Sequence, residues 1–308
     1  MDKFLTTADV PPQFLKGAYL VGDIPLRALA SDTRVSYTLY IPPKHYNPSP
    51  SATPDDGEST NKKLPLLIYV PGTKRHMTPM HSYLAPFADS TPCAVLAPLF
   101  PCYIEGPNDL ESYTVLRSAT LRYDLALLSI LDEVAQYWPG IETSKVFMMG
   151  FSAGGQFAHR FLYLYPERVA AISIGSQSHT TALDKTKDWP VGIANVETLF
   201  SRAVNKELIR NVPIQLVIGS EDNRVEEEFW EWVDQMKTQG GDQETIWLTR
   251  MRRARDITFR EFRAMLEEND IKTQLDVVEG VAHVGDAVQE HVLRFLQPLI
   301  RERVPSIE

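Results

Sequence analysis

A Gly-Phe-Ser-Ala-Gly-Gly segment at residues 150–155 constrains the fold of this chain more strongly than any other feature. It follows an apolar run at 145–149 that is typical of a buried parallel strand. It precedes a segment whose apolar residues fall on one helical face. A serine between such a strand and such a helix lies on a sharp turn at the carboxyl edge of a sheet. Because a Cβ two positions before or after the serine would clash across that turn, the glycines at 150 and 154 fit this geometry.

The same segment has a simpler interpretation, in which the glycines only begin a helix. The Gly-x-Ser-x-Gly pattern by itself is weak evidence for either interpretation. The strand pattern before it and the helical pattern after it favour a strained turn that holds the serine hydroxyl forward. Ser152 is therefore a candidate nucleophile.

Strand and helix patterns alternate along most of the chain. A period-two segment at 35–41 comes first, and buried-strand runs follow at 64–70, 93–98, 145–149, 169–174, 213–218 and 274–278. Helical patterns are found at 82–88, 116–137, 155–162, 257–269 and 287–300, and in the longest of them leucines 121, 125, 128 and 131 are spaced for one buried face. This order indicates an α/β fold in which helices cover both faces of a mostly parallel sheet. We expect one domain over 1–308, with ligands bound beyond the carboxyl ends of the strands.

Three segments interrupt this alternation. A polar, proline-rich stretch at 47–63 predicts a flexible surface loop. Insertions at 179–212 and 223–256 follow strand patterns and are expected to form a small cap over the carboxyl edge of the sheet. Both insertions contain tryptophan, and the alternative is that these aromatic residues only pack the loops down.

Composition excludes several classes of function. A formal net charge of −9 argues against nucleic-acid binding, which requires clustered Lys and Arg. No apolar run is long enough to span a membrane, and the first residues lack the pattern of a secretory signal, so a soluble cytoplasmic protein is expected. Cys93 and Cys102 have neither metal-binding spacing nor a disulfide framework, and no metal site is expected.

A serine nucleophile at neutral pH needs a base, usually histidine, that a carboxylate orients. Asp222 follows the strand pattern at 213–218, although Glu221 is an alternative acid and both could simply cap the loop. His283 follows the strand pattern at 274–278 in a loop that glycines bracket. A loop histidine is often only solvent-exposed, but the order Ser152, Asp222, His283 is the one expected for a catalytic triad on this kind of sheet.

An oxyanion formed at the serine would need backbone N–H donors. Ala153 directly follows the serine at a predicted helix N-terminus, where the helix dipole also favours negative charge. Thr73 lies in the loop after the strand at 64–70, where Gly72 lets the backbone approach closely. Lys74 and Arg75 follow, and they are expected to be solvated, the alternative being attraction of an acidic substrate.

Five segments together resemble the α/β-hydrolase superfamily, namely 71–73, 97–101, 122–125, 150–161 and 280–283. Within it, the chain is similar to the compact poly(3-hydroxybutyrate)-depolymerase-like serine esterases, over residues 17 to 300. The resemblance implies an α/β-hydrolase fold and an acyl-enzyme mechanism without a cofactor. It also implies that Ser152 is the nucleophile, Asp222 the acid and His283 the base. Such enzymes often have His-Gly before the oxyanion loop, where this chain has Pro71 and Gly72.

The expected function is hydrolysis of a carboxylic ester or lactone of a small molecule. Candidate residues for the substrate pocket are Met77, Tyr103, Phe151, Trp189 and Trp230. These side chains would favour an apolar or aromatic substrate. The alternatives are carbon–carbon bond hydrolysis or acyl transfer by the same triad, and a non-catalytic ligand-binding protein on the same fold. Neither nucleic acid nor a membrane is an expected partner, and the sequence does not indicate an oligomeric state.

Overall fold

The computed structural model describes residues 5–50, 63–107, 109–222 and 255–303. These residues form an eight-stranded sheet in the order β1-β2-β4-β3-β5-β6-β7-β8. The strands are β1 (Gly22–Leu29), β2 (Asp32–Ile41), β3 (Leu64–Val70), β4 (Ala94–Leu99), β5 (Ile141–Phe151), β6 (Val169–Gly175), β7 (Ile214–Gly219) and β8 (Gln274–Val278). β1 pairs with β2 and β2 with β4 in antiparallel fashion, and the remaining neighbours are parallel.

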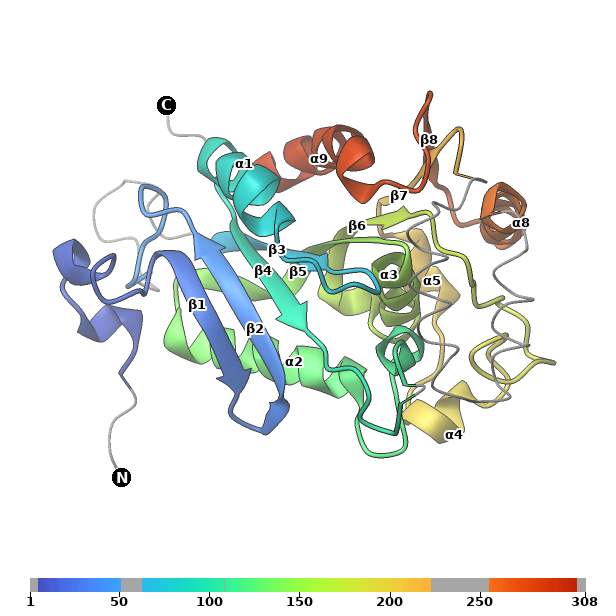
Figure 1. Cartoon of the computed structure of the whole chain (residues 1–308), viewed down its shortest axis with the longest axis horizontal. Helices are drawn as coiled ribbons and strands as arrows, with labels where there is room; N and C mark the ends of the chain where they lie inside the picture. Colours follow the sequence, from blue (N-terminus) through green and yellow to red (C-terminus); the bar gives the residue numbers. More distant parts are fainter. Residues whose placement is uncertain (1–4, 51–62, 108, 223–254, 304–308) are drawn as a thin grey trace.

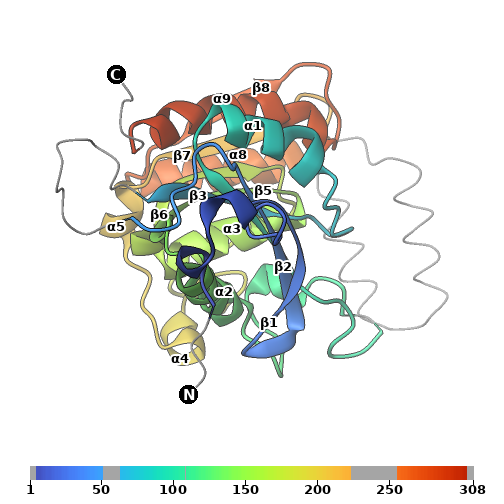
Figure 2. The ribbon, with the colours of Figure 1, turned by 90° about the vertical axis from the view of Figure 1, so that its left-hand side faces the viewer.

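Helices cover both faces of the sheet (Figures 1 and 2). The α-helices are α1 (Ala85–Ser90), α2 (Tyr123–Tyr137), α3 (Ala153–Leu164), α4 (Val196–Phe200), α5 (Lys206–Arg210), α8 (Arg255–Glu268) and α9 (Gly285–Arg301). Short helical turns are η1 (Thr7–Asp9), η2 (Pro12–Phe14), η3 (Met80–Leu84, a π-helix), η4 (Ser112–Val115) and η5 (Pro166–Arg168). Helices α1 and α9 lie on one face, and α2 and α3 lie on the other.

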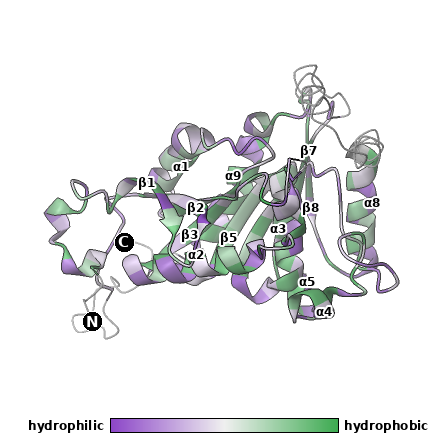
Figure 3. Ribbon diagram, turned by 60° about the horizontal axis from the view of Figure 1, so that its bottom comes forward, coloured by the Kyte–Doolittle hydropathy of each residue, from purple (hydrophilic) through white to green (hydrophobic). Residues whose placement is uncertain are grey.

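The central strands are apolar along their whole length because both of their faces are buried. Every residue of β3, β6 and β7 is buried. Two apolar clusters result, one between the sheet and α2 and α3, the other between the sheet and α1 and α9. Figure 3 shows hydrophobic residues concentrated on the central strands. The predicted α/β architecture with a mostly parallel sheet is confirmed.

The longest predicted helix begins later than its leucine spacing indicates. Leu116 has a left-handed backbone, with φ at 66°, and α2 starts only at Tyr123. A left-handed residue ends the preceding helical turn, so the helix cannot run through it. Leu125 is exposed, and the buried face of α2 is built instead around Leu127, Leu131 and their neighbours.

The insertion at 179–212 contains α4 and α5 and is anchored on the helices of the α3 face. Trp189 and Phe200 belong to the apolar cluster there, and Arg202 donates to the carbonyl oxygen of Leu164 at the end of α3. Residues 51–62 of the predicted surface loop and 223–254 of the second insertion lie outside the described residues. The small cap therefore stays a prediction. Among the described helices, none has the length and apolar character needed to cross a membrane.

Candidate active site

Ser152 occupies a strained turn between β5 and α3. Its backbone has φ 57° and ψ −122°, a conformation that residues other than glycine rarely adopt. A Cβ on Gly150 would lie 2.3 Å from the carbonyl oxygen of Gly154, and a Cβ on Gly154 would lie 2.1 Å from that of Val70. Glycine is therefore required at both positions, as the sequence predicts. The turn is held in place by the N–H of Ser152, which donates to the carbonyl oxygen of Gly175 at 2.8 Å.

The structure brings Ser152, His283 and Asp222 together in one hydrogen-bonded chain. His283 Nε2 lies 2.9 Å from Ser152 Oγ, and His283 Nδ1 lies 2.9 and 3.1 Å from the two carboxylate oxygens of Asp222. Because a carboxylate accepts, Nδ1 carries the ring proton and Nε2 is left to accept the proton of the serine hydroxyl. The Asp222 side chain is fully buried, whereas His283 is 19% exposed. Such an arrangement can activate the serine as a nucleophile.

Two loops at the carboxyl ends of β7 and β8 position Asp222 and His283. They are joined by backbone bonds, since Glu221 N–H donates to Val281 O and Ser220 N–H to Val278 O, each at 2.9 Å. A Cβ on Gly219 would lie 2.1 Å from the carbonyl oxygen of Val281, so only glycine permits this approach. Of the two candidate acids, Asp222 faces His283, and Glu221 is exposed.

The loop after β3 passes directly beside the serine. A Cβ on Gly72 would lie 3.4 Å from Phe151 O and 3.9 Å from Ser152 Cβ. Thr73 follows in this loop, and Ala153 is the first residue of α3, where helical geometry leaves the N–H without a partner inside the helix. Ala153 thus directly follows Ser152, and Thr73 directly follows the residue that approaches it; that their amides bind an oxyanion stays a prediction. The Thr73 hydroxyl donates to the carboxylate of Glu111, which precedes η4, and this bond links the loop to that turn.

Arg75 holds the same loop in place, although the sequence favours a solvated side chain. Its Nη1 donates to Thr73 O at 2.6 Å, and its guanidinium lies 4.1 Å from the centre of the Tyr113 ring. Tyr113 is buried, and its hydroxyl donates to Pro71 O at 3.0 Å. The expectation for Arg75 is wrong because a partly buried guanidinium can satisfy several carbonyl oxygens of a tight turn at once.

The predicted pocket residues do not form one group. Phe151 packs against the His283 ring at 4.8 Å between centroids and lines a cavity on the α9 side of the sheet. Met77 packs on the apolar cluster of that same side, and Tyr103 is 48% exposed. Trp189 is buried, donates from Nε1 to Val115 O and packs edge-on against Phe200. Trp230 lies outside the described residues.

Sequence reasoning missed the polar side chains near the serine. Gln156 and Arg160 are four residues apart in α3, so the two lie on one face of that helix. Gln156 Nε2 donates to Ser178 Oγ at 3.3 Å, and Arg160 Nε donates to Thr181 Oγ1 at 2.8 Å. The spacing of four was the available signal.

The described residues contain no group of three or more His, Cys, Asp or Glu side chains that could hold a metal ion. The arrangement itself offers a hydroxyl, an imidazole and a buried carboxylate.

Comparison with known proteins identifies the fold. No family model and no curated protein sequence matches the chain. A poly(3-hydroxybutyrate) depolymerase from Bordetella parapertussis matches with a TM-score of 0.62 and 19% identity, over 98% of this chain and 96% of that one. Poly(aspartic acid) hydrolase-1 from Sphingomonas sp. KT-1 matches with a TM-score of 0.56 and 18% identity, over 84% of this chain and 92% of that one. An S-formylglutathione hydrolase from Agrobacterium tumefaciens matches with a TM-score of 0.53 and 17% identity, over 88% of this chain and 90% of that one. The chain has the α/β-hydrolase fold, as the sequence predicts.

Proposed function

We propose that the protein is a serine hydrolase that cleaves a carboxylic ester through an acyl-enzyme. The observation that carries the proposal is the hydrogen-bonded chain from Ser152 Oγ through His283 to the buried Asp222. A hydroxyl that only packs or caps a helix needs no such base and acid behind it. The neighbours in fold are named as hydrolases and a depolymerase, which agrees with this proposal.

The reaction follows from the geometry in two matching halves. As Ser152 Oγ bonds to the ester carbonyl carbon, its proton passes to Nε2 of His283, and Asp222 stabilises the resulting imidazolium. The carbonyl oxygen becomes an oxyanion between the amides of Ala153 and Thr73. When the intermediate collapses, the alcohol leaves with the proton of His283. A water molecule then repeats both steps on the acyl-enzyme, which releases the acid and restores the serine.

Treatment with a fluorophosphonate followed by intact-mass analysis tests the proposal. We expect one adduct on the parent protein and none on Ser152→Ala, because only an activated serine attacks this reagent. Ser82→Ala, which removes an exposed serine elsewhere, should keep the adduct. A folded parent that forms no adduct, or a Ser152→Ala variant that still forms one, would contradict the proposal. The first of these results would favour a non-catalytic binding protein.

A further inference from the structure

The side of Ser152 that faces β6 is polar. Phe151 pairs with Gly175 in the sheet, so the residues after Gly175 run alongside Ser152 and the first turn of α3. Ser178 in this segment bonds to Gln156, one turn into α3. Ser176 has a left-handed backbone, with φ at 42°, which for a residue other than glycine is often associated with function. We call residues 176–178, together with Gln156, the polar segment.

Two side chains of the polar segment are buried and lack hydrogen-bond partners. Gln177 and Ser176 are both fully buried. Neither the amide oxygen nor the amide nitrogen of Gln177 has a partner, and the same holds for Ser176 Oγ. A buried polar group without a partner typically costs about 1–3 kcal/mol, so such groups are rare unless something else binds them. Gln156 and Ser178 beside them are bonded, and Gln177 is the residue of the segment with both a donor and an acceptor left unpaired.

We infer that Gln177 is a specificity-determining residue of a polar acyl subsite beside Ser152, and that this subsite takes an acyl group bearing an amide. The inference rests on the proposed function. A glutamine amide presents one acceptor and one donor side by side in a plane. A primary carboxamide satisfies both at once, because an N–H on the same side as its C=O donates to the Gln177 oxygen while the C=O accepts from the Gln177 nitrogen. A purely aliphatic or aromatic acyl group would leave both atoms of Gln177 unpaired, which is how a polar site rejects an apolar ligand.

A polar acyl subsite differs from the apolar or aromatic pocket expected from the sequence. The sequence favours an apolar or aromatic pocket, because it contains Phe151 and Trp189 near the site. In the structure Trp189 packs in the core, and Phe151 faces the α9 side of the sheet. Polar side chains are present instead on the segment that follows β6 and in the first turn of α3, namely Ser176, Gln177, Ser178 and Gln156.

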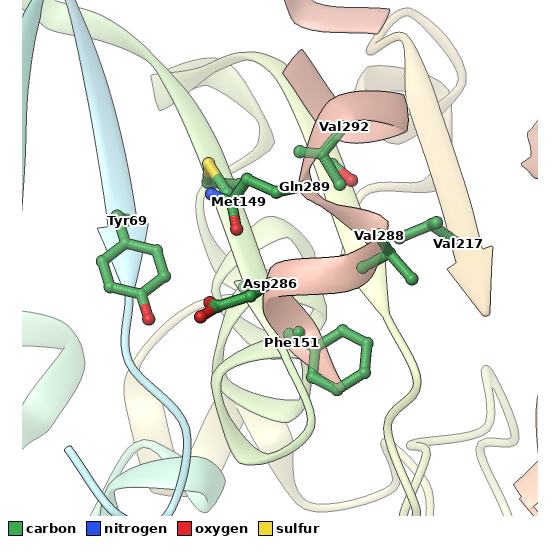
Figure 4. Close-up of a pocket in the computed structure, with 11 residues that line it drawn as sticks. Tyr69, Met149, Phe151, Val217, Asp286, Val288, Gln289 and Val292 are labelled. Atoms are coloured by element: carbon green, nitrogen blue, oxygen red, sulfur yellow. The ribbon is translucent and has the colours of Figure 1, made fainter. Parts of the chain in front are cut away.

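Gln289 provides a matched control on the opposite face of the sheet. It is 5% exposed, and its Nε2 also lacks a partner. It lines a cavity of about 40 Å³ that Tyr69, Val288 and Val292 also line (Figure 4). A cavity of this size has room for a water molecule that can satisfy the amide. Removing the Gln289 amide should therefore leave ester selectivity unchanged.

The test compares Gln177→Met and Gln289→Met with the parent on three p-nitrophenyl esters of equal acyl length. One acyl chain carries an amide, one a hydroxyl, and one only methylenes. We expect the parent to favour the amide ester over the alkyl ester about tenfold or more in kcat/KM, consistent with the loss of a hydrogen bond at a buried polar site. Gln177→Met should reduce this ratio to near one while keeping activity on the alkyl ester. Its melting temperature should rise, because an unpaired buried amide is removed. Gln289→Met should keep the ratio of the parent.

Other outcomes distinguish a failure of the proposed subsite from a failure of the proposed function. A parent that forms the fluorophosphonate adduct but shows the same kcat/KM for the amide and alkyl esters would overturn the subsite alone. A preference that survives in Gln177→Met, or a Gln177→Met variant that loses activity equally on all three esters, would do the same. A preference for the hydroxyl ester that disappears in Gln177→Met would overturn the amide assignment. Absence of the adduct on the parent would instead overturn the proposed function.

Discussion

At the scale of single residues, the contacts and burial of Asp222 fit the role of an acid that orients His283. Its carboxylate accepts from His283 with both oxygens and is fully buried. Asp222→Asn replaces one acceptor oxygen with a donor, so the imidazole would turn its unprotonated nitrogen toward residue 222 and lose its role as a base. We expect kcat to fall by about 10⁴-fold while the fold is retained, as expected for the wrong histidine tautomer.

The control for this prediction is Glu221→Gln, which changes the neighbouring exposed acid. Its kcat should stay close to that of the parent, because the Glu221 backbone, rather than its carboxylate, joins the two loops. Both variants are measured with saturating p-nitrophenyl ester and checked for folding by circular dichroism. A larger loss in Glu221→Gln than in Asp222→Asn would reverse the assignment of the acid.

The sequence predicts the positions of Ser152, Asp222 and His283 because each follows a strand pattern, and parallel strands end at one edge of a sheet. It does not predict where side chains in the surrounding loops point. Phe151 is adjacent to the serine in sequence, yet the alternation of the strand directs it to the α9 face. Trp189 is drawn into the core, where its Nε1 reaches Val115 O. Both outcomes depend on tertiary packing, which local patterns do not contain.

At the scale of elements, α3 is tied to the 179–212 insertion by a buried neutral histidine. His159 Nδ1 lies 3.0 Å from Gly155 O and therefore donates, and Nε2 accepts from Thr181 N–H at 3.2 Å. The ring also contacts Tyr163 and Phe262 edge-on. Burial, helped by the neighbouring Arg160 cation, holds the pKa of His159 well below its usual 6.5, and the bond to Gly155 opposes this only in part.

This low pKa makes stability depend on pH. Below pH 6.5 the unfolded chain takes up a proton at residue 159, whereas the folded protein does not. The contribution to stability is therefore complete above about pH 6.5 and is lost as the pH falls, by up to about 1.4 kcal/mol per pH unit. Urea unfolding between pH 7.5 and 5 should give a steeper decline for the parent than for His159→Gln, whose amide can make both hydrogen bonds without titrating. Equal slopes for the two proteins would contradict this account.

Residue patterns predict the bounds of some helices and strands correctly and those of others incorrectly. β3 and β8 are predicted at their observed bounds, since a short apolar or alternating run bounded by turns is a clear signal. The start of α2 is predicted seven residues too early because the pattern of residue types does not reveal that the backbone of Leu116 is left-handed. Leucine spacing indicates which residues could share a helix face. The backbone at the end of η4 determines where the helix can begin.

At the scale of the whole molecule, the order of strands in the sheet brings the residues of the candidate site together. Ser152 and His283 are 131 residues apart, and β5-β6-β7-β8 places the ends of their strands along one edge. Helix α9 begins at Gly285, two residues after His283, and packs along β5, β6 and β7. His283 thus lies between the loop that is bonded to the end of β7 and the first turn of α9, while the rest of α9 covers the apolar cluster. Stability and catalysis should then be separable along this one helix.

Leu296→Ala tests that separation. Leu296 is fully buried in the α9-side cluster, so its truncation should lower the free energy of unfolding by about 2–5 kcal/mol. It lies eleven residues beyond Gly285, about 16 Å along the helix at 1.5 Å per residue, and kcat at 25 °C should stay close to that of the parent while the protein is folded. Leu125→Ala on α2, where the leucine is 46% exposed, should change stability by well under about 1 kcal/mol. Urea unfolding and ester kinetics on the same samples measure both quantities. A fall in kcat for folded Leu296→Ala would mean that packing of the distal α9 sets the position of His283, and that the site depends on the whole helix rather than on its first turn.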